Sequence, residues 1–267
     1  MANIIVTGVL GRMGRLIATC VLERSTLKLV GATEQADHPN MGQDLGELLG
    51  KGKLGISVSS DLDNIIGPSD VIIDFTAPTA TLKHLNCVQK HKKAIVIGTT
   101  ALSTDDKKNI QKAGENIGVV MAPNMSIGVN LLFNLLGDVA KKLGEEYDIE
   151  ITEKHHKFKK DAPSGTAVRM AEIVAEARGK NLDDVVCYGR KGLVGERKKG
   201  EISIHAIRAG DIIGEHTVTF GGMGERVELT HIAHSRETFV RGAIFAAEFI
   251  SKKKNGFFTM QDILKGI

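Results

Sequence analysis

The first half of this 267-residue chain alternates between two hydrophobic periods. Short β-branched runs indicate strands at 3–7, 27–33, 71–75, 94–97 and 118–121. Segments with helical spacing lie between them, at 12–24, 79–91 and 103–116. Connections of this length join parallel strands through helices that cover both faces of the sheet. The alternation therefore predicts an α/β fold with a Rossmann-like, doubly wound parallel sheet.

The hydrophobic pattern changes at about residue 126. An apolar-rich helix, a strand and a second helix are indicated at 127–143, 147–155 and about 164–178. Three alternating runs follow, separated by glycine-rich turns typical of antiparallel hairpins, at 201–208, 215–220 and 226–232. A helix at about 236–253 has one apolar face, and we expect it to return to the first domain. The predicted domains are therefore 1–126 plus 236–267, and an α+β domain at 127–235 on a mostly antiparallel open sheet.

Composition excludes several classes of protein. Hydrophobic residues make up 42% of the chain and charged residues 25%, which are values of a globular protein and not of a disordered one. A net charge of +3 is too small for a nucleic-acid binder. The three cysteines lie far apart, and no apolar stretch approaches the roughly 18 residues of a membrane span. We expect a cytoplasmic protein that binds neither nucleic acid nor membrane.

The histidines are numerous enough to raise the question of a metal site. His231 and His234 have a spacing that metal ligands use. They fall in a predicted strand, however, where residues three apart face opposite ways. We therefore expect no metal site.

A glycine-rich turn follows the first predicted strand and opens the first helix. It reads Gly8-Val9-Leu10-Gly11-Arg12-Met13-Gly14. Glycines there let backbone N–H groups approach a pyrophosphate, whose charge the helix dipole favours. The same glycines also occur in tight turns without a ligand, but the strand–helix context indicates a dinucleotide site and hence a dinucleotide-binding first domain.

Glu34 closes the second predicted strand, where a carboxylate would accept hydrogen bonds from the adenosine ribose. Its charge would repel a 2′-phosphate, and Gln35 stands where an Arg would clamp one. Arg12 and Arg15 still offer positive charge nearby. The cofactor prediction is NAD or NADP, leaning towards NAD.

Other loops follow predicted strands and should meet at the carboxyl edge of the sheet, where open parallel sheets bind ligands. Their predicted cofactor contacts are Phe75, Thr76, Gly98, Thr99, Thr100, Ala122, Pro123, Asn124 and Met125. Each of these loops, taken singly, is equally well an ordinary strand–helix connection.

The segment EKHHKFKKDAPSGT at 153–166 concentrates two imidazoles, four ammonium groups and a small-residue helix start. Ammonium groups balance carboxylate charge, and a helix N-terminus offers free N–H donors. An ordinary basic loop is the alternative. The combination favours capture of a small dianion and donation of a proton to it, and so a substrate-binding role for the second domain. The open sheet of this domain leaves a face and edges that need cover, which favours an oligomerisation role as well.

With these motifs in place, the sequence resembles the dihydrodipicolinate reductase family of the diaminopimelate and lysine pathway. The resemblance covers nearly the whole chain and follows family order. Its motifs are GVLGRMG at 8–14, DFT at 74–76, GTT at 98–100, APNMSIGVN at 122–130, EKHHKFKKDAPSGT at 153–166, AIRAGDIIGEHTVTF at 206–220 and GERVELTHIAHSRETF at 224–239. It implies reduction of 4-hydroxy-tetrahydrodipicolinate to tetrahydrodipicolinate with loss of water, by a homotetramer.

The resemblance also implies residue roles in the second domain. His155 is similar to the family's general acid, and Lys159 to a second proton donor or charge stabiliser that also binds substrate. His156 corresponds to a substrate contact, and Gly165 and Thr166 to the donors that hold a ring carboxylate. Arg236, in the SRETF run, is expected to help position the cofactor domain or a carboxylate. The family often has Phe at position 125, and some members have Arg at 77 or 35, where this chain has Met, Ala and Gln.

The implied chemistry suits these residue types. Hydride addition pushes negative charge into the substrate ring, and a cationic imidazole at His155 can then supply a proton. Hydride transfer needs the two carbons at about 3–3.5 Å, so we expect hinge closure through about 126–130 and 235–240. A nucleotide-sensing protein without turnover and a dehydrogenase for another carboxylated substrate are the alternatives, and a sensor would need no proton donor beside an anion cradle.

Overall fold

The computed structural model describes residues 1–265 and divides into two compact units. Unit 1 consists of Met1–Ile127 with Glu237–Ile267, and unit 2 of Gly128–Arg236. Each unit has its own sheet and its own apolar core. The units are described separately below.

Unit 1 contains a seven-stranded sheet in the order β12-β6-β5-β4-β1-β2-β3, in which every strand pair is parallel. Its strands are β1 (Ala2–Thr7), β2 (Leu27–Thr33), β3 (Val58–Ser59), β4 (Val71–Asp74), β5 (Ala94–Ile97), β6 (Gly118–Met121) and β12 (Gly256–Phe258). The helices are α1 (Arg12–Leu22), α2 (Leu45–Leu48), α3 (Pro78–Lys90), α4 (Thr104–Ala113), α8 (Glu237–Ile250) and α9 (Met260–Leu264). This confirms the Rossmann-like doubly wound sheet.

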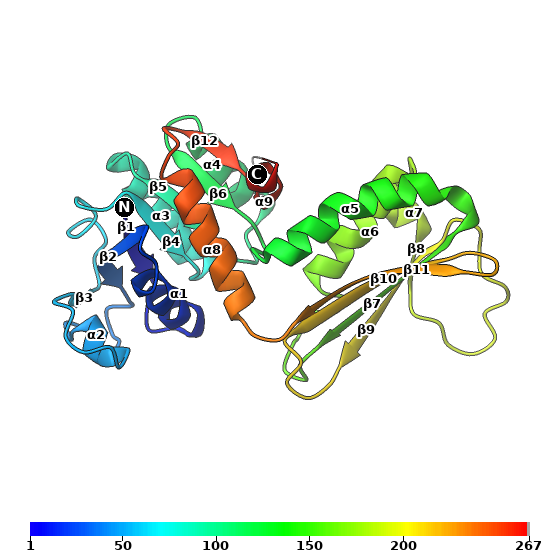
Figure 1. The fold of residues 1–267 in the computed structure, drawn as a ribbon, viewed down its shortest axis with the longest axis horizontal. Helices are drawn as coiled ribbons and strands as arrows, with labels where there is room; N and C mark the ends of the chain where they lie inside the picture. Colours follow the sequence, from blue (N-terminus) through cyan, green and yellow to red (C-terminus); the bar gives the residue numbers. More distant parts are fainter. Residues whose placement is uncertain (266–267) are drawn as a thin grey trace. The chain divides into compact units, whose positions relative to one another are not determined.

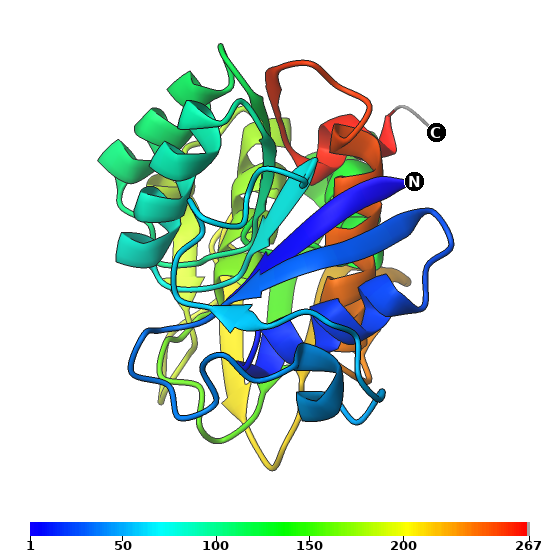
Figure 2. The ribbon, with the colours of Figure 1, turned by 90° about the vertical axis from the view of Figure 1, so that its left-hand side faces the viewer.

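Alternation along the strands divides the apolar side chains of unit 1 between two faces. Ile4 and Val6 pack with the apolar residues of α1 and α8, whereas Ile5 and Ile72 pack with those of α3 and α4. Figure 2 shows α1 and α8 on one side of this sheet and α3 and α4 on the other. Both faces are therefore covered, as a buried parallel sheet requires.

The returning C-terminal helix is confirmed, because α8 belongs to unit 1. Four short elements of this unit were not predicted, one of them the C-terminal helix α9. The 256–258 segment forms β12 at the edge beside β6, and α2 and β3 lie beyond β2. Elements this short carry too few residues to show a period.

Unit 2 contains a five-stranded sheet in the order β11-β10-β7-β9-β8 (Figure 1). Its strands are β7 (Asp148–His155), β8 (Val186–Tyr188), β9 (Ile202–Arg208), β10 (Gly214–Gly221) and β11 (Arg226–Ala233). The helical segments are α5 (Ile127–Leu143), the 3₁₀ turn η1 (Gly144–Glu146), α6 (Gly165–Ala177) and α7 (Leu182–Val185). One face packs on α5 and α6. This confirms the α+β architecture of the second domain.

One predicted connection in unit 2 is wrong. The glycine-rich turn after β9 does not form a hairpin, because β7 lies between β9 and β10 and runs parallel to β9. Ile151 of β7 faces Ile204 of β9 on one side and Val218 of β10 on the other, and all three are buried. In the central position, Ile151 of β7 has an apolar neighbour on each adjacent strand. The sheet is mixed, because β7 pairs antiparallel with β10 and parallel with β9.

Two helical glycines give a test of how tightly the helices pack. A Cβ on Gly242 of α8 would lie 1.7 Å from the Met125 carbonyl oxygen, whereas one on Gly137 of α5 would meet nothing closer than 3.7 Å. We expect Gly242→Ala to destabilise the protein by about 2–4 kcal/mol because backbone must move. Gly137→Ala should stabilise it by about 0.5–1 kcal/mol through helix propensity. Urea unfolding measures both, and equal effects would contradict this account.

Candidate active site

The glycine turn between β1 and α1 packs so tightly on its own backbone that a side chain would not fit at Gly14. Gly8 has φ +60°, and a Cβ on Gly14 would lie 2.1 Å from the Gly8 carbonyl oxygen. Gly11 caps α1 without a side-chain hydrogen bond, and the first turn of α1 contains no acidic residue. The backbone N–H groups of Val9, Leu10 and Gly11 are already bonded. The donors without a helical partner are therefore those in the first turn of α1, at residues 12–14, and a helix start of this kind fits the pyrophosphate of a dinucleotide.

Glu34 connects the end of β2 to this turn. One carboxylate oxygen accepts a hydrogen bond from Leu10 N and the other from Gln35 N, each at 2.9 Å. Arg15 donates to the carbonyl oxygens of Leu10 at 3.1 Å and Leu48 at 2.9 Å. Its guanidinium is therefore engaged with backbone, while Arg12 at the helix start is exposed.

A cavity of about 580 Å³ lies at this edge of the sheet. Six predicted cofactor residues line it: Gly8, Leu10, Gly11, Glu34, Phe75 and Thr76. Residues of α3 and its approach, which were not predicted, also line it: Ala77, Thr79, Ala80, Lys83 and His84. Beyond β2 the lining includes Gln35, which the sequence placed beside a 2′-phosphate, together with Ala36, His38 and Ser60, which were not predicted. Their positions follow from the fold, since nothing local in the sequence marks them.

The other predicted cofactor residues do not line this cavity. Val9, Met13 and Met125 pack in the core on the α1 and α8 side, and Ala122 is also buried. A Cβ on Gly98 would overlap the Phe75 ring at 2.2 Å, so this glycine makes room for Phe75. Of the remaining residues, Thr99 is buried, and Thr100 and Pro123 are exposed. The Asn124 Oδ1 accepts a hydrogen bond from Ser126 N at 2.9 Å. Arg236 belongs to unit 2, as its last residue.

Asp74, at the end of β4, is a buried carboxylate that organises the loops around Phe75. It accepts hydrogen bonds from the hydroxyls of Thr76, Thr81 and Thr99, and His84 Nδ1 lies 2.5 Å from its other oxygen. Burial alone would raise the pKa of Asp74, but these partners hold it below its usual value. Thr81 and His84 were missed because they lie one and two turns into α3.

In unit 2 a second buried carboxylate, Glu153, faces His155 on the same side of β7. His155 Nδ1 lies 2.6 Å from Glu153 Oε2, and Arg208 of β9 pairs with both oxygens at 2.7 and 2.8 Å. Ser164 N, at the start of α6, donates to Oε1 at 3.0 Å. Burial would raise the pKa of Glu153, but Arg208 and His155 lower it below the usual value.

His216 of β10 lies against His155, with ring centroids 5.1 Å apart in an edge-on arrangement. Its Nε2 is 2.9 Å from the Ser164 hydroxyl. Burial, together with the neighbouring His155, lowers the pKa of His216 to about 3, so this ring stays neutral. The pKa of His155 itself is lowered, chiefly by burial, although Glu153 opposes the shift.

The loop between β7 and α6 brings together the other predicted substrate residues. Lys159 Nζ pairs with both oxygens of Asp161 at 2.8 and 2.9 Å, and its charge contributes to the lowered pKa of His155. His156 has a buried Nδ1 for which no hydrogen-bond partner is found among the described residues. Gly165 and Thr166 form the first turn of α6 after the cap residue Ser164. Glu153, Arg208 and His216 were not predicted.

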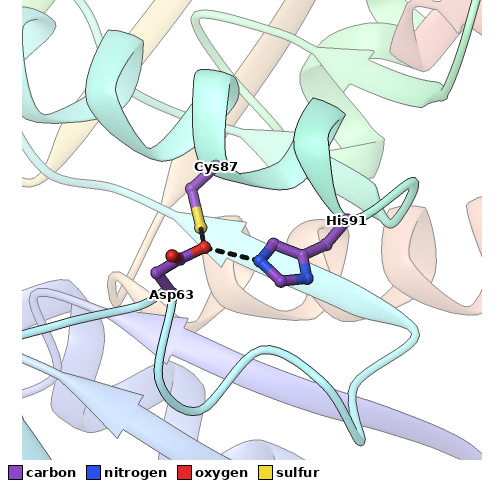
Figure 3. Close-up of side chains that lie close together, drawn as sticks. All are labelled: Asp63, Cys87 and His91. Atoms are coloured by element: carbon purple, nitrogen blue, oxygen red, sulfur yellow. Dashed lines mark hydrogen bonds and ion pairs between the residues drawn. The ribbon is translucent and has the colours of Figure 1, made fainter.

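Asp63, Cys87 and His91 form a separate cluster at the end of α3 (Figure 3). Their donor atoms are of the kinds that zinc accepts and lie within 4.8 Å of one another. Lys90 Nζ, however, lies 2.8 and 3.1 Å from the two Asp63 oxygens. This lysine and His91 lower the pKa of Asp63 to about 2, and burial raises the pKa of Cys87 to about 11. A cation thus already neutralises the carboxylate, and the thiol is protonated.

Helices capable of crossing a membrane are absent from the part of the chain that the structure describes. Two family models match the chain, those of the N-terminus of dihydrodipicolinate reductase over residues 2–125 and of its C-terminus over 128–264. A curated 4-hydroxy-tetrahydrodipicolinate reductase of Syntrophus aciditrophicus is 53% identical over 99% of this chain and 98% of its own length. One from Geotalea uraniireducens is 48% identical over 99% of each chain.

Solved structures agree with these matches. A dipicolinate-bound dihydrodipicolinate reductase from Paenisporosarcina sp. TG-14 superposes with a TM-score of 0.75 at 26% identity, covering 97% of both chains. GenD2 from gentamicin A biosynthesis, solved with NAD, shares the fold alone, with a TM-score of 0.62 at 13% identity over 98% of this chain and 90% of that one. On the family models and the full-length identity, this chain belongs to the dihydrodipicolinate reductase family.

Proposed function

We propose that this protein reduces 4-hydroxy-tetrahydrodipicolinate to tetrahydrodipicolinate, with loss of water, in diaminopimelate and lysine biosynthesis. Full-length identity to reductases of that name supports the activity. The observation that carries the proposal is the site around His155. The site combines the His155 imidazole, the Lys159 ammonium and the N-terminus of α6. The carboxylate beside the imidazole, Glu153, is already paired with Arg208. Such a site can take up a dianion and protonate it.

A nicotinamide dinucleotide fits unit 1 through the glycine turn and the adjoining cavity. A Cβ at Gly8, Gly11 or Gly14 would crowd the space beside the turn. When bound, the cofactor supplies a hydride, and the residues of this chain do the rest. The N-terminus of α1 would hold the pyrophosphate, beside the lining residues Gly8, Leu10 and Gly11, and Glu34 would hold the adenosine ribose.

The residues of unit 2 have separable tasks in the reaction. The backbone N–H of Gly165 and the Thr166 hydroxyl, in the first turn of α6, would bind one ring carboxylate, with His156 as a further contact. Lys159 lowers the energy of the negative charge that develops in the ring. His155 then gives its Nε2 proton to the carbanionic ring carbon: the N–H bond breaks, a C–H bond forms, and the imidazole becomes neutral.

Other family features remain part of the proposal. We infer a cytoplasmic homotetramer assembled through unit 2, as the family resemblance implies. The sheet face away from α5 and α6 includes the exposed residues Ile207 and Ile232, which supports a covering partner. Arg236 is proposed to help hold the cofactor domain or a carboxylate.

The activity can be tested with the freshly formed product of dihydrodipicolinate synthase and NADH or NADPH. We expect substrate-dependent loss of absorbance at the reduced nicotinamide band. His155→Gln and Lys159→Ala should each lower kcat by about 10²–10⁴-fold, because the proton donor or its charge support is lost. Tyr188→Phe, an exposed change elsewhere in unit 2, is the control. Full turnover in a His155→Gln and Lys159→Ala double variant would refute the assigned roles.

The leaning towards NAD gives a second test. Glu34 repels a 2′-phosphate, so kcat/KM should be higher with NADH than with NADPH. Gln35→Arg places a guanidinium on the lining of the cavity and should shift the NADPH/NADH ratio of kcat/KM upward by about tenfold. The same change at the exposed Gln43, outside that lining, should leave the ratio unchanged. A ratio that responds equally to both variants would show that net charge alone acts.

A further inference from the structure

Glu153 is a fully buried carboxylate whose hydrogen-bonding capacity is filled by three groups. These are His155 Nδ1, both terminal nitrogens of Arg208 and the backbone N–H of Ser164, all within 3.0 Å. Carboxylates are rarely buried unless they are paired, because desolvation is costly. The fold therefore accepts the desolvation cost of the Glu153 carboxylate beside the predicted acid His155, which indicates a role for this carboxylate at the site.

We propose that Glu153 and Arg208 form a positioning pair that keeps His155 protonated on Nδ1 and so reserves Nε2 as the nitrogen that delivers the proton. This inference rests on the proposed function. An ionised carboxylate can only accept, so the imidazole nitrogen facing it must carry a hydrogen in both protonation states. After donation from Nε2, the ring remains the Nδ1–H tautomer and does not turn.

Space around the imidazole supports Nε2 as the reactive nitrogen. A Cβ on Gly214, at the start of β10, would lie 3.1 Å from His155 Nε2. Because position 214 is glycine, that flank of the nitrogen is free of a side chain. His216 packs edge-on against the ring and limits its rotation. The ring is thus held at Nδ1 and on one side, and position 214 places no side chain against Nε2.

Arg208 sets how strongly Glu153 acts on the imidazole. Unpaired, a buried carboxylate would hold the imidazolium too firmly for easy proton release. Arg208 neutralises it and also donates to the Asp161 carbonyl oxygen at 2.7 Å, in the loop that carries Lys159. The charged and titratable groups around His155 are Glu153, Arg208, Lys159, Asp161 and His216. Of these, Glu153 raises the pKa of His155, and Lys159 and Arg208 lower it.

The chain contains its own control for this arrangement. Glu150 lies three residues earlier on β7, on the other face of the sheet. It also binds a histidine and arginines, with His205 Nε2 at 2.7 Å and Arg190 and Arg197 at 2.8 and 3.0 Å. Among residues 1–265, the hydrogen bonds of Glu150, His205, Arg190 and Arg197 do not reach His155, Glu153 or Arg208, so replacing this carboxylate changes the same kind of cluster elsewhere.

The test is Glu153→Gln in the full chain, with imidazole ¹⁵N NMR titration and the pH dependence of kcat. Loss of the carboxylate charge removes the interaction that raises the pKa of His155, so this pKa should fall further, and the Nδ1–H tautomer should lose its dominance. Because the protonated ring is the active acid, the alkaline limb of the kcat profile should move to lower pH. We expect kcat to fall about 10–100-fold with KM changed much less.

Two further variants make the outcome decisive. Glu150→Gln should leave the His155 titration unchanged, and Glu153→Asp should restore part of the tautomer preference. If the unpaired Arg208 prevents folding of Glu153→Gln, Glu153→Gln with Arg208→Met removes the charge together with its partner. An unchanged tautomer and an unchanged pKa of His155 in a folded Glu153 variant would overturn the proposal. The NMR readout needs no substrate, so a failure of the proposed reaction would be seen separately, as absent turnover in the unmodified protein.

Discussion

Burial of the Glu153 carboxylate is the constraint on which the site in unit 2 depends. The oxygens of this residue join three elements: β7, which carries Glu153 and His155, β9, which supplies Arg208, and the N-terminus of α6 at Ser164. An unpaired charge at this depth would cost several kcal/mol. The strand order of the sheet therefore matters to the chemistry, because only β7 between β9 and β10 allows Arg208 and His216 to flank the same imidazole.

Unit 1 contains a comparable buried carboxylate, Asp74. That carboxylate is also buried at a strand end, but it is satisfied by threonine hydroxyls and His84 instead of by an arginine. Its partners are close in sequence or in adjoining loops, so it fixes the shape of the loops at Phe75 and Thr99. In both units a carboxylate at the carboxyl end of a strand organises the loops around it. In unit 2 the carboxylate also contacts the imidazole of His155, the proposed proton donor.

Sequence reasoning predicted the parts of this molecule that are local. Helix α5 and strands β5 and β6 appear where the hydrophobic period indicated. The order of strands in unit 2 could not be predicted, because a glycine-rich turn is compatible with a hairpin or with a crossing over another strand. Short elements such as β3 and β12 depend on neighbours that are distant in sequence.

The candidate site residues also divide into those that a local pattern indicated and those that only the fold brings together. His155, His156, Lys159, Gly165 and Thr166 lie within one segment. Its composition marked the segment as a candidate anion site, and the family resemblance implied the roles of the single residues. Arg208, His216 and His84 come from elements that only the fold brings near, so their roles could not be predicted.

Glu153 did leave a signal in the sequence. It occupies the next position after Ile149 and Ile151 on the side of β7 that faces the core. A charged residue on the apolar face of a strand must be paired or must do chemistry, and the adjacent histidine pair indicated which groups to examine. Reading strand faces for misplaced charges would therefore have found the positioning carboxylate, although not the arginine that neutralises it.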